Sequence, residues 1–204
     1  FAVAGQFFKY NLWVAVFTII AAISSRLDTF LSARLLVASE IGIYGAANQL
    51  VQVVPQIVGA LGVVAAPKFA GFQTKEKMFA YFKKFQLLVL GLAILGVSII
   101  PISYFAIPLI YGVQYKDAVL PFIILLLAML TFLISVPIHN SIIYYFGKPQ
   151  VFVWISIGHL LIVGFLGYWL ILSYGVVGAA VTVLIGMLFN FLVPLGWFLW
   201  RIKR

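Results

Sequence analysis

Runs of about 20 mostly apolar residues recur along this chain, and they limit its fold more than any other feature. A bilayer core about 30 Å thick is crossed by roughly 20 helical residues. Inside that core every backbone N–H and C=O must pair within the protein, which favours helices. Of the 204 residues, 65% are hydrophobic and only 8% are charged, against about 25% charged in soluble domains. We therefore predict an all-α integral membrane protein.

Charged residues and helix breakers divide the chain into six predicted membrane spans within one membrane domain, 1–204. The spans cover residues 11–35, 41–66, 84–107, 118–143, 150–173 and 176–200. Ser39 and Glu40 are expected to cap the second span and Pro67 to stop it. Turns are expected at Gly112, at 147–149 and, very tightly, at 174–175. The prediction is a six-transmembrane-helix bundle.

Five prolines within or near these spans are expected to kink them. They are Pro55, Pro101, Pro121, Pro137 and Pro194.

Basic residues fall mostly on one side of the predicted membrane. That side carries Lys9, Lys68, Lys75, Lys77, Lys83, Lys84, Lys148, Arg201, Lys203 and Arg204. Only Arg34 and Lys116 fall on the other side. Because cytoplasmic loops are rich in Lys and Arg, both ends of this segment and the connections 67–84 and 144–149 are predicted to be cytoplasmic.

The connection 74–85 interleaves four lysines with Met78, Phe79, Tyr81 and Phe82. This pattern is typical of an amphipathic helix lying on the inner leaflet. A simple extension of the next span, with lysines reaching toward water, gives the same pattern. The sequence leaves both interpretations open.

Arg26 and Asp28 place two charges in the outer half of the first span. A charge at the centre of a bilayer costs roughly 2.5–3.5 kcal/mol even on insertion scales, so such residues tend to face a wet cavity or a partner. Arg26 is a candidate contact for an anionic group, because guanidinium binds phosphate bidentately. Asp28 is then a proton-linked or structural carboxylate. The alternative is a helix end that lies closer to water.

Polar residues also recur at every fourth position on three spans, which places each set on one helix face. The sets are Asn48, Gln52 and Gln56; Thr131, Ser135 and His139; and Thr182, Gly186 and Asn190. Each set is explained by hydrogen bonds between helices, but their recurrence favours a shared cavity. His139 and His159 either couple to protons or serve as neutral hydrogen-bonding residues. The predicted cavity residues are Arg26, Asp28, Asn48, Gln52, Gln56, Thr131, Ser135, His139 and Asn190.

Several other functions lack the residues they need. The chain has no cysteine, and its four acidic residues are scattered without a carboxylate pair, metal-ligand cluster or Ser-His-Asp arrangement. Its formal charge of +9 is spread among apolar runs and forms no nucleic-acid patch. We therefore expect no enzyme, no metal and no cofactor. Because the chain starts at Phe1 without a signal-peptide pattern, we expect a fragment.

Three stretches, 26–50, 107–118 and 145–180, resemble polysaccharide flippases. The likeness rests on Asp28 followed by Gly-Ile-Tyr-x-x-Ala at 42–47, and on Tyr-Gly-x-x-Gly-Ala-Ala at 174–180. The chain is similar to the C-terminal half of O-antigen and exopolysaccharide transporters in the multidrug, oligosaccharidyl-lipid and polysaccharide exporter superfamily. Arg26 corresponds to positions where members often have cavity-lining cations.

The resemblance implies one lobe of a two-lobe, 12-helix or 14-helix transporter in the plasma (inner) membrane of a prokaryote. The N-terminal half is then the missing partner, and the substrate is a lipid-linked oligosaccharide moved by alternating access. Coupling to a proton or sodium gradient stays open. Three alternatives remain: an exporter of organic cations, disfavoured by the few acidic residues; a membrane glycosyltransferase or polymerase, disfavoured by short loops; and a non-transporting helical partner.

Overall fold

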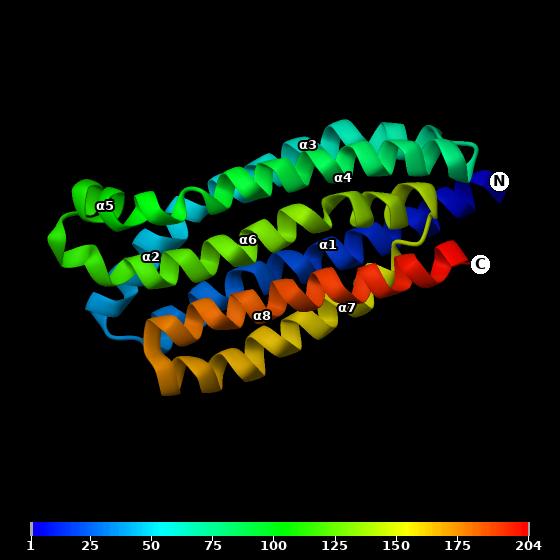
Figure 1. Cartoon of the computed structure of the whole chain (residues 1–204). Helices are drawn as coiled ribbons and strands as arrows, with labels where there is room; N and C mark the ends of the chain where they lie inside the picture. The colour runs from blue at the N-terminus through cyan, green and yellow to red at the C-terminus, as the bar shows by residue number, and fades with distance from the viewer. Residues whose placement is uncertain (1, 204) are drawn as a thin grey trace.

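A computed structural model describes residues 2–203, and in this range the secondary structure is entirely helical (Figure 1). Arg204 and the side chain of Lys9 lie outside the described residues. Five helical segments are long and apolar enough to span a membrane: Tyr10–Leu35, Ala38–Gly71, Lys75–Val97, Val113–Tyr145 and Gln150–Lys203. Ile100–Tyr111 is a shorter apolar helix. The prediction of an all-α, multi-pass membrane protein is confirmed.

The last of the five segments, 54 residues long, contains a reversal at Gly175. This glycine has φ 56° and ψ −133°, and Figure 1 shows the chain turning back there. Both arms exceed the roughly 20 residues that one crossing needs. The arms pack so closely that a Cβ at Gly178 would lie 2.0 Å from the Leu170 carbonyl oxygen. The very tight turn predicted at 174–175 is therefore confirmed.

The helices follow one another in a simple order, with short irregular helices where the chain bends. They are α1 (Ala2–Leu35), α2 (Ala38–Val51), α3 (Val53–Gly71), α4 (Lys75–Val97), α5 (Ile100–Tyr111), the 3₁₀ helix η1 (Val113–Ala118), α6 (Val119–Asn140), the π-helix η2 (Ser141–Tyr145), α7 (Gln150–Leu161), the π-helix η3 (Ile162–Leu166) and α8 (Gly167–Lys203).

The predicted second span begins and ends differently from expectation. The helix starts at Ala38, so Ser39 lies inside it and does not cap it. Glu40 does contribute, because its Oε2 accepts a hydrogen bond of 3.2 Å from the Val37 N–H. Pro67 does not stop the helix, which continues to Gly71. A proline removes one hydrogen bond to the preceding turn without preventing helical dihedrals after it.

The prolines mark several of the bends. Pro55 follows the break at Gln52 that separates α2 from α3, where a proline leaves a carbonyl of the preceding turn unpaired. Pro137 precedes the π-turn η2, and the Ser141 hydroxyl donates to its carbonyl at 2.7 Å. Pro101 lies at the start of α5, after a break at 98–99. Pro121 lies in the first turn of α6 and Pro194 inside α8.

Residues 75–85 form the first turns of α4, which continues without interruption to Val97. Their apolar side packs on protein: the Phe79 and Phe82 rings lie 6.2 and 4.8 Å from the Phe198 ring of α8. Lys83 and Lys84 are exposed. A surface helix would direct its apolar side into lipid. The structure thus agrees with the helix-extension interpretation.

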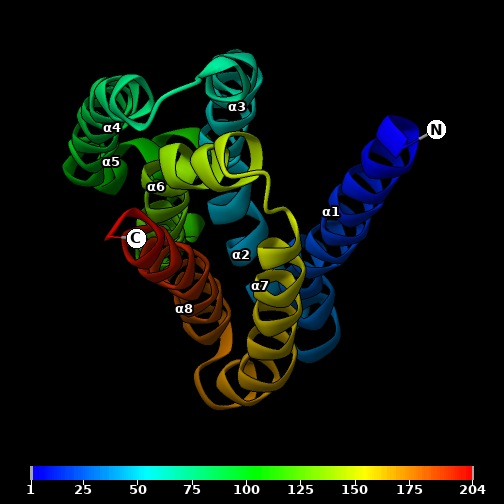
Figure 2. The ribbon, with the colours of Figure 1, turned by 90° about the vertical axis from the view of Figure 1, so that its right-hand side faces the viewer.

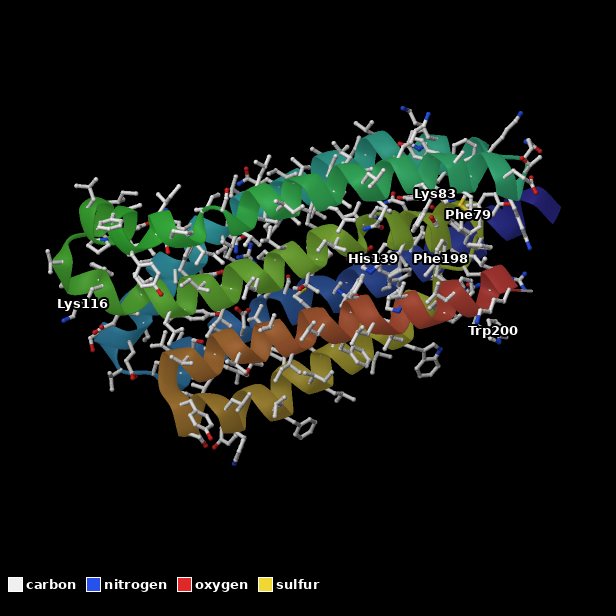
Figure 3. All side chains as sticks on the ribbon, viewed as in Figure 1. Phe79, Lys83, Lys116, His139, Phe198 and Trp200 are labelled. Carbon is white, nitrogen blue, oxygen red and sulfur yellow. The ribbon has the colours of Figure 1, made fainter. Side chains whose placement is uncertain are left out.

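Helix α6 forms the centre of the bundle and carries the longest set of buried residues. It packs against α2, α3, α4 and α8. Helix α1 contacts α7 and α8 and lies at the edge of the bundle, as the end-on view in Figure 2 shows. Both termini and the connections after α3 and η2 lie at one end of the bundle, while Lys116 lies at the other (Figures 1 and 3). The lysine-rich connections therefore share one end.

We predict that Gly178→Ala destabilises the protein, because the added Cβ meets backbone that cannot move without opening the α8 reversal. A loss of more than about 2 kcal/mol of folding free energy is expected. Thermal unfolding in detergent measures it. Gly196→Ala is the matched control on the same helix, since nothing lies within 4 Å of its added Cβ. Equal stability of the two variants would contradict the proposed packing.

Candidate functional site

A cavity of about 400 Å³ lies between α1, the α2–α3 break, α6, α7 and α8. It combines polar groups with aromatic and aliphatic side chains. Its lining comprises Phe17, Ala21, Ser24, Ser25, Arg26, Asp28, Thr29, Asn48, Gln52, Pro55, Met129, Phe132, His139, Ile143, Phe152, Ser156, His159, Val163, Val183, Met187 and Asn190. Six of the nine predicted cavity residues are in this set: Arg26, Asp28, Asn48, Gln52, His139 and Asn190.

Arg26 is an exposed cation on the cavity wall. Helix α1 continues to Leu35, so Arg26 lies about 13 Å of helix before its end. This depth argues against the interpretation that the charge lies at a helix end. In the described part of the chain no carboxylate lies within ion-pair distance of Arg26. Its guanidinium therefore has its donors available for a ligand.

Asp28 lines the same cavity as Arg26, although residues two positions apart on a helix point in different directions. The Tyr44 hydroxyl donates to Oδ2 of Asp28 at 2.5 Å, which joins α1 to α2. A hydrogen bond to a carboxylate is stronger than a neutral one. The geometry thus favours the structural interpretation of Asp28. Tyr44 belongs to the Gly-Ile-Tyr-x-x-Ala motif that follows Asp28 in the sequence, but the contact between the two residues is visible only in the structure.

Two of the three polar residues predicted on the second span, Asn48 of α2 and Gln52 at the α2–α3 break, reach the cavity, whereas Gln56 of α3 does not. The Gln52 amide donates to Oδ1 of Asn48 at 3.1 Å, and both residues line the cavity. Gln56 is exposed and lies outside the lining. The helix is broken at Gln52, just before Pro55. The four-residue spacing therefore does not place Gln56 on the same face as Asn48 and Gln52.

Of the three polar residues predicted on one face of α6, one lines the cavity and two do not. His139 reaches the cavity, with Nε2 at 3.0 Å from the Asn190 carbonyl oxygen of α8. Thr131 and Ser135 lie outside the lining, and their hydroxyls donate within α6 to Leu127 and Phe132 carbonyls at 2.8 and 2.6 Å. A hydroxyl bonded to its own helix is satisfied without a cavity.

The three residues predicted on one face of α8, Thr182, Gly186 and Asn190, also differ in what they contact. Asn190 lines the cavity, whereas the Thr182 hydroxyl donates to the Gly178 carbonyl at 2.8 Å. Gly186 faces His159, because a Cβ there would lie 2.6 Å from the His159 Nε2 atom. Its role is therefore close packing of α8 on α7.

A buried pair of Ser24 and His159 is the main feature that the sequence did not reveal. The Ser24 Oγ lies 2.5 Å from Nδ1 of His159 and links α1 to α7. Ser25 and Ser156 also line the cavity beside this pair. The sequence singles out His159 as a titratable residue, but Ser24 lies 135 positions away from it, and local spacing cannot pair the two.

The cavity therefore offers one unpaired guanidinium, several amide and hydroxyl groups, and aromatic surface from Phe17, Phe132 and Phe152. Such a set suits a ligand with an anionic group and neighbouring hydroxyls. Within the described residues no three His, Asp or Glu side chains come together as a metal site would require.

Fold and cavity together define a multi-pass membrane protein with a polar cavity among its helices. A family profile described as "Polysaccharide biosynthesis protein" matches residues 1–120, which is more than half of the chain. The chain belongs to this family. The match includes Arg26, Asp28, Asn48 and Gln52. Comparison with curated proteins and with solved structures gave no match in either case.

We predict that water reaches the cavity wall, and the absence of native cysteine makes this simple to test. Ser25→Cys and Gln52→Cys, in membranes, should react with a hydrophilic thiol reagent at least roughly tenfold faster than a lipid-facing thiol, because the reactive thiolate needs water. Ile94→Cys is the control, since Ile94 is 70% exposed on apolar α4. Similar rates at all three positions would contradict a wet cavity.

Proposed function

We propose that this chain is the C-terminal lobe of a flippase that moves a polyprenyl-pyrophosphate-linked oligosaccharide from the cytoplasmic to the outer leaflet. One observation carries the proposal: an unpaired guanidinium, Arg26, lines a polar cavity inside an apolar helical bundle. Membership of the polysaccharide biosynthesis family supports a saccharide-bearing substrate.

In this proposal Arg26 binds the pyrophosphate. Planar guanidinium forms two parallel hydrogen bonds to phosphate oxygens, which favours Arg over Lys at such a site. The site is also short of competing anions, because the only carboxylate in the cavity lining, Asp28, is engaged by Tyr44. An intramembrane cation without a protein partner is costly, and a bound anion would offset that cost.

The saccharide would then bind to the amides of Asn48 and Gln52 and to the polar groups of His139 and Asn190. Amides both donate and accept, as sugar hydroxyls do. Gln56, Thr131 and Ser135 lie outside the lining, so we leave them out of the proposed site. The apolar wall, including Phe132, provides contact for the sugar ring faces.

Alternating access requires that helices around the cavity change their packing. Helix α1 packs along α7 and α8, and three polar contacts add to this packing: Ser24 to His159, Asp28 to Tyr44, and the Tyr10 hydroxyl to the Ile143 carbonyl at 3.0 Å. In this proposal the contacts of α1 with α7 and α8 exchange when the cavity opens to the other side. An N-terminal lobe would close the open side of the cavity.

The proposed orientation places the lysine-rich end, with both ends of the segment, in the cytoplasm of a prokaryote. Export of organic cations is the rival within the same superfamily. A cationic substrate would need an available carboxylate or an aromatic cage. The cavity does have aromatic rings, but its cation is unpaired and its carboxylate is bonded to Tyr44, which favours an anionic substrate.

We predict that Arg26→Ala, in the transporter reconstituted with its N-terminal lobe, slows leaflet transfer of a labelled lipid-linked oligosaccharide by roughly tenfold to a hundredfold. That range follows from losing a charged hydrogen-bonded contact. Arg34→Ala is the matched control: Arg34 ends the same helix, lies over the Phe30 ring at 5.8 Å and is outside the cavity lining.

Transfer in the folded Arg26→Ala variant equal to that of the unaltered protein would remove Arg26 from the mechanism. The absence of any transfer by the folded, two-lobed protein would reject the flippase proposal and favour a non-transporting helical partner.

A further inference from the structure

A second polar cavity, separate from the first, lies at the lysine-rich end of the bundle. It has a volume of about 450 Å³ and is lined by Phe72, Gln73, Lys75, Tyr145, Phe146 and Arg201. These residues come from the α3–α4 connection, the start of α4, the end of η2 and the last turn of α8. None of them lines the first cavity.

The position of this cavity along the membrane normal follows from the helix ends. Phe72 directly follows the span Ala38–Gly71, Lys75 begins Lys75–Val97, and Tyr145 ends Val113–Tyr145. Arg201 lies in the last turn of the span that ends at Lys203. Four candidate spans thus end around one cavity, which therefore lies at the level of the lipid headgroups.

The lining of this cavity carries two cations and no carboxylate. Lys75 and Arg201 are both exposed, and within residues 2–203 neither has a carboxylate at ion-pair distance. Three of the four acidic residues, Asp28, Glu40 and Asp117, lie outside α4 and outside the cavity lining; the fourth, Glu76, follows Lys75 in the first turn of α4, where it is exposed and also outside the lining. The N-terminal end of α4 adds its partial positive charge.

The neutral lining also matches a headgroup. Phe72, Tyr145 and Phe146 give the cavity an aromatic edge, and rings of this kind are enriched where membrane meets water. Gln73 and the Tyr145 hydroxyl supply neutral hydrogen-bonding groups. Phe146 also packs on Trp197 and Phe198 with ring centres at 5.7 and 6.2 Å, which attaches this part of the lining to α8.

We propose that this cavity binds the phosphate headgroup of an anionic membrane phospholipid, with Lys75 and Arg201 on the phosphate and the acyl chains passing between the helix ends. A basic pocket between helices at the headgroup level is the form that such lipid sites take. The proposal concerns binding only and holds whether or not the protein transports lipid-linked sugar.

The test measures lipid binding to the full chain in mild detergent by native mass spectrometry, with phosphatidylglycerol compared with phosphatidylcholine. The double variant Lys75→Ala/Arg201→Ala should bind phosphatidylglycerol roughly tenfold more weakly, because two charge-assisted contacts are lost. The matched control is Lys83→Ala/Lys84→Ala, which removes the same charge from exposed positions of α4 outside the cavity. It should change binding less than about twofold.

Equal weakening by both double variants would overturn the proposal in favour of diffuse surface charge. So would equal affinity of the unaltered chain for the two lipids. If the Ala variant fails to fold, Lys75→Arg/Arg201→Lys retains both charges and should retain binding; its loss would contradict a role for charge. Inorganic pyrophosphate is the second probe: if it binds in a Lys75- and Arg201-dependent way while phosphatidylglycerol does not, the lipid assignment is overturned.

Discussion

A polar group buried in this bundle is stabilised by a partner within the protein, because lipid offers none. Several groups find that partner in hydrogen bonds between helices, although Ser32 Oγ, Gln86 Oε1, Gln150 Oε1 and His159 Nε2 are buried without a partner in the described residues. Asp28 accepts from Tyr44, Ser24 pairs with His159, and His139 reaches the Asn190 carbonyl. These contacts join α1 to α2, α1 to α7, and α6 to α8. The same contacts surround the cavity, so packing of the bundle and formation of the site have one origin.

Arg26 is a charged group that lines the cavity without an ion-pair partner in the described residues, and the functional account rests on it. It shares the cavity with Asp28, yet the nearby carboxylate is taken by Tyr44. A protein that needed only stability would pair these two charges or replace them with apolar residues. An unpaired cation in this cavity destabilises the protein, and a bound anion would offset that cost. The polar cavity is thus better explained by a ligand than by folding.

Much of this fold follows from the sequence, because a bilayer restricts the choice of structure so strongly. Apolar run lengths predict long helices, although the predicted span 84–107 is divided at 98–99 between α4 and α5. Gly175 and Gly112 mark turns that the structure has, both with positive φ. The break at Gln52 and the position of Pro67 inside α3 did not follow from the sequence, because a proline can break, kink or continue a helix.

The site is predicted only in part, for a related reason. Spacing along one helix identifies the residues of one face but not what that face packs against. It therefore groups Thr131 with His139, although only His139 reaches the cavity. Pairs distant in sequence, such as Ser24 with His159, require the fold itself.

The most direct test of the central claim locates the substrate on the protein. A lipid-linked oligosaccharide with a photoreactive group next to the pyrophosphate is cross-linked to the protein, reconstituted with its proposed N-terminal lobe, and the labelled peptides are identified by mass spectrometry. The account predicts label on residues 17–29 of α1 and on residues 48–55 around the α2–α3 break, reduced by Arg26→Ala. Label confined to the outer faces of α4 and α5, with no change in that variant, would contradict it.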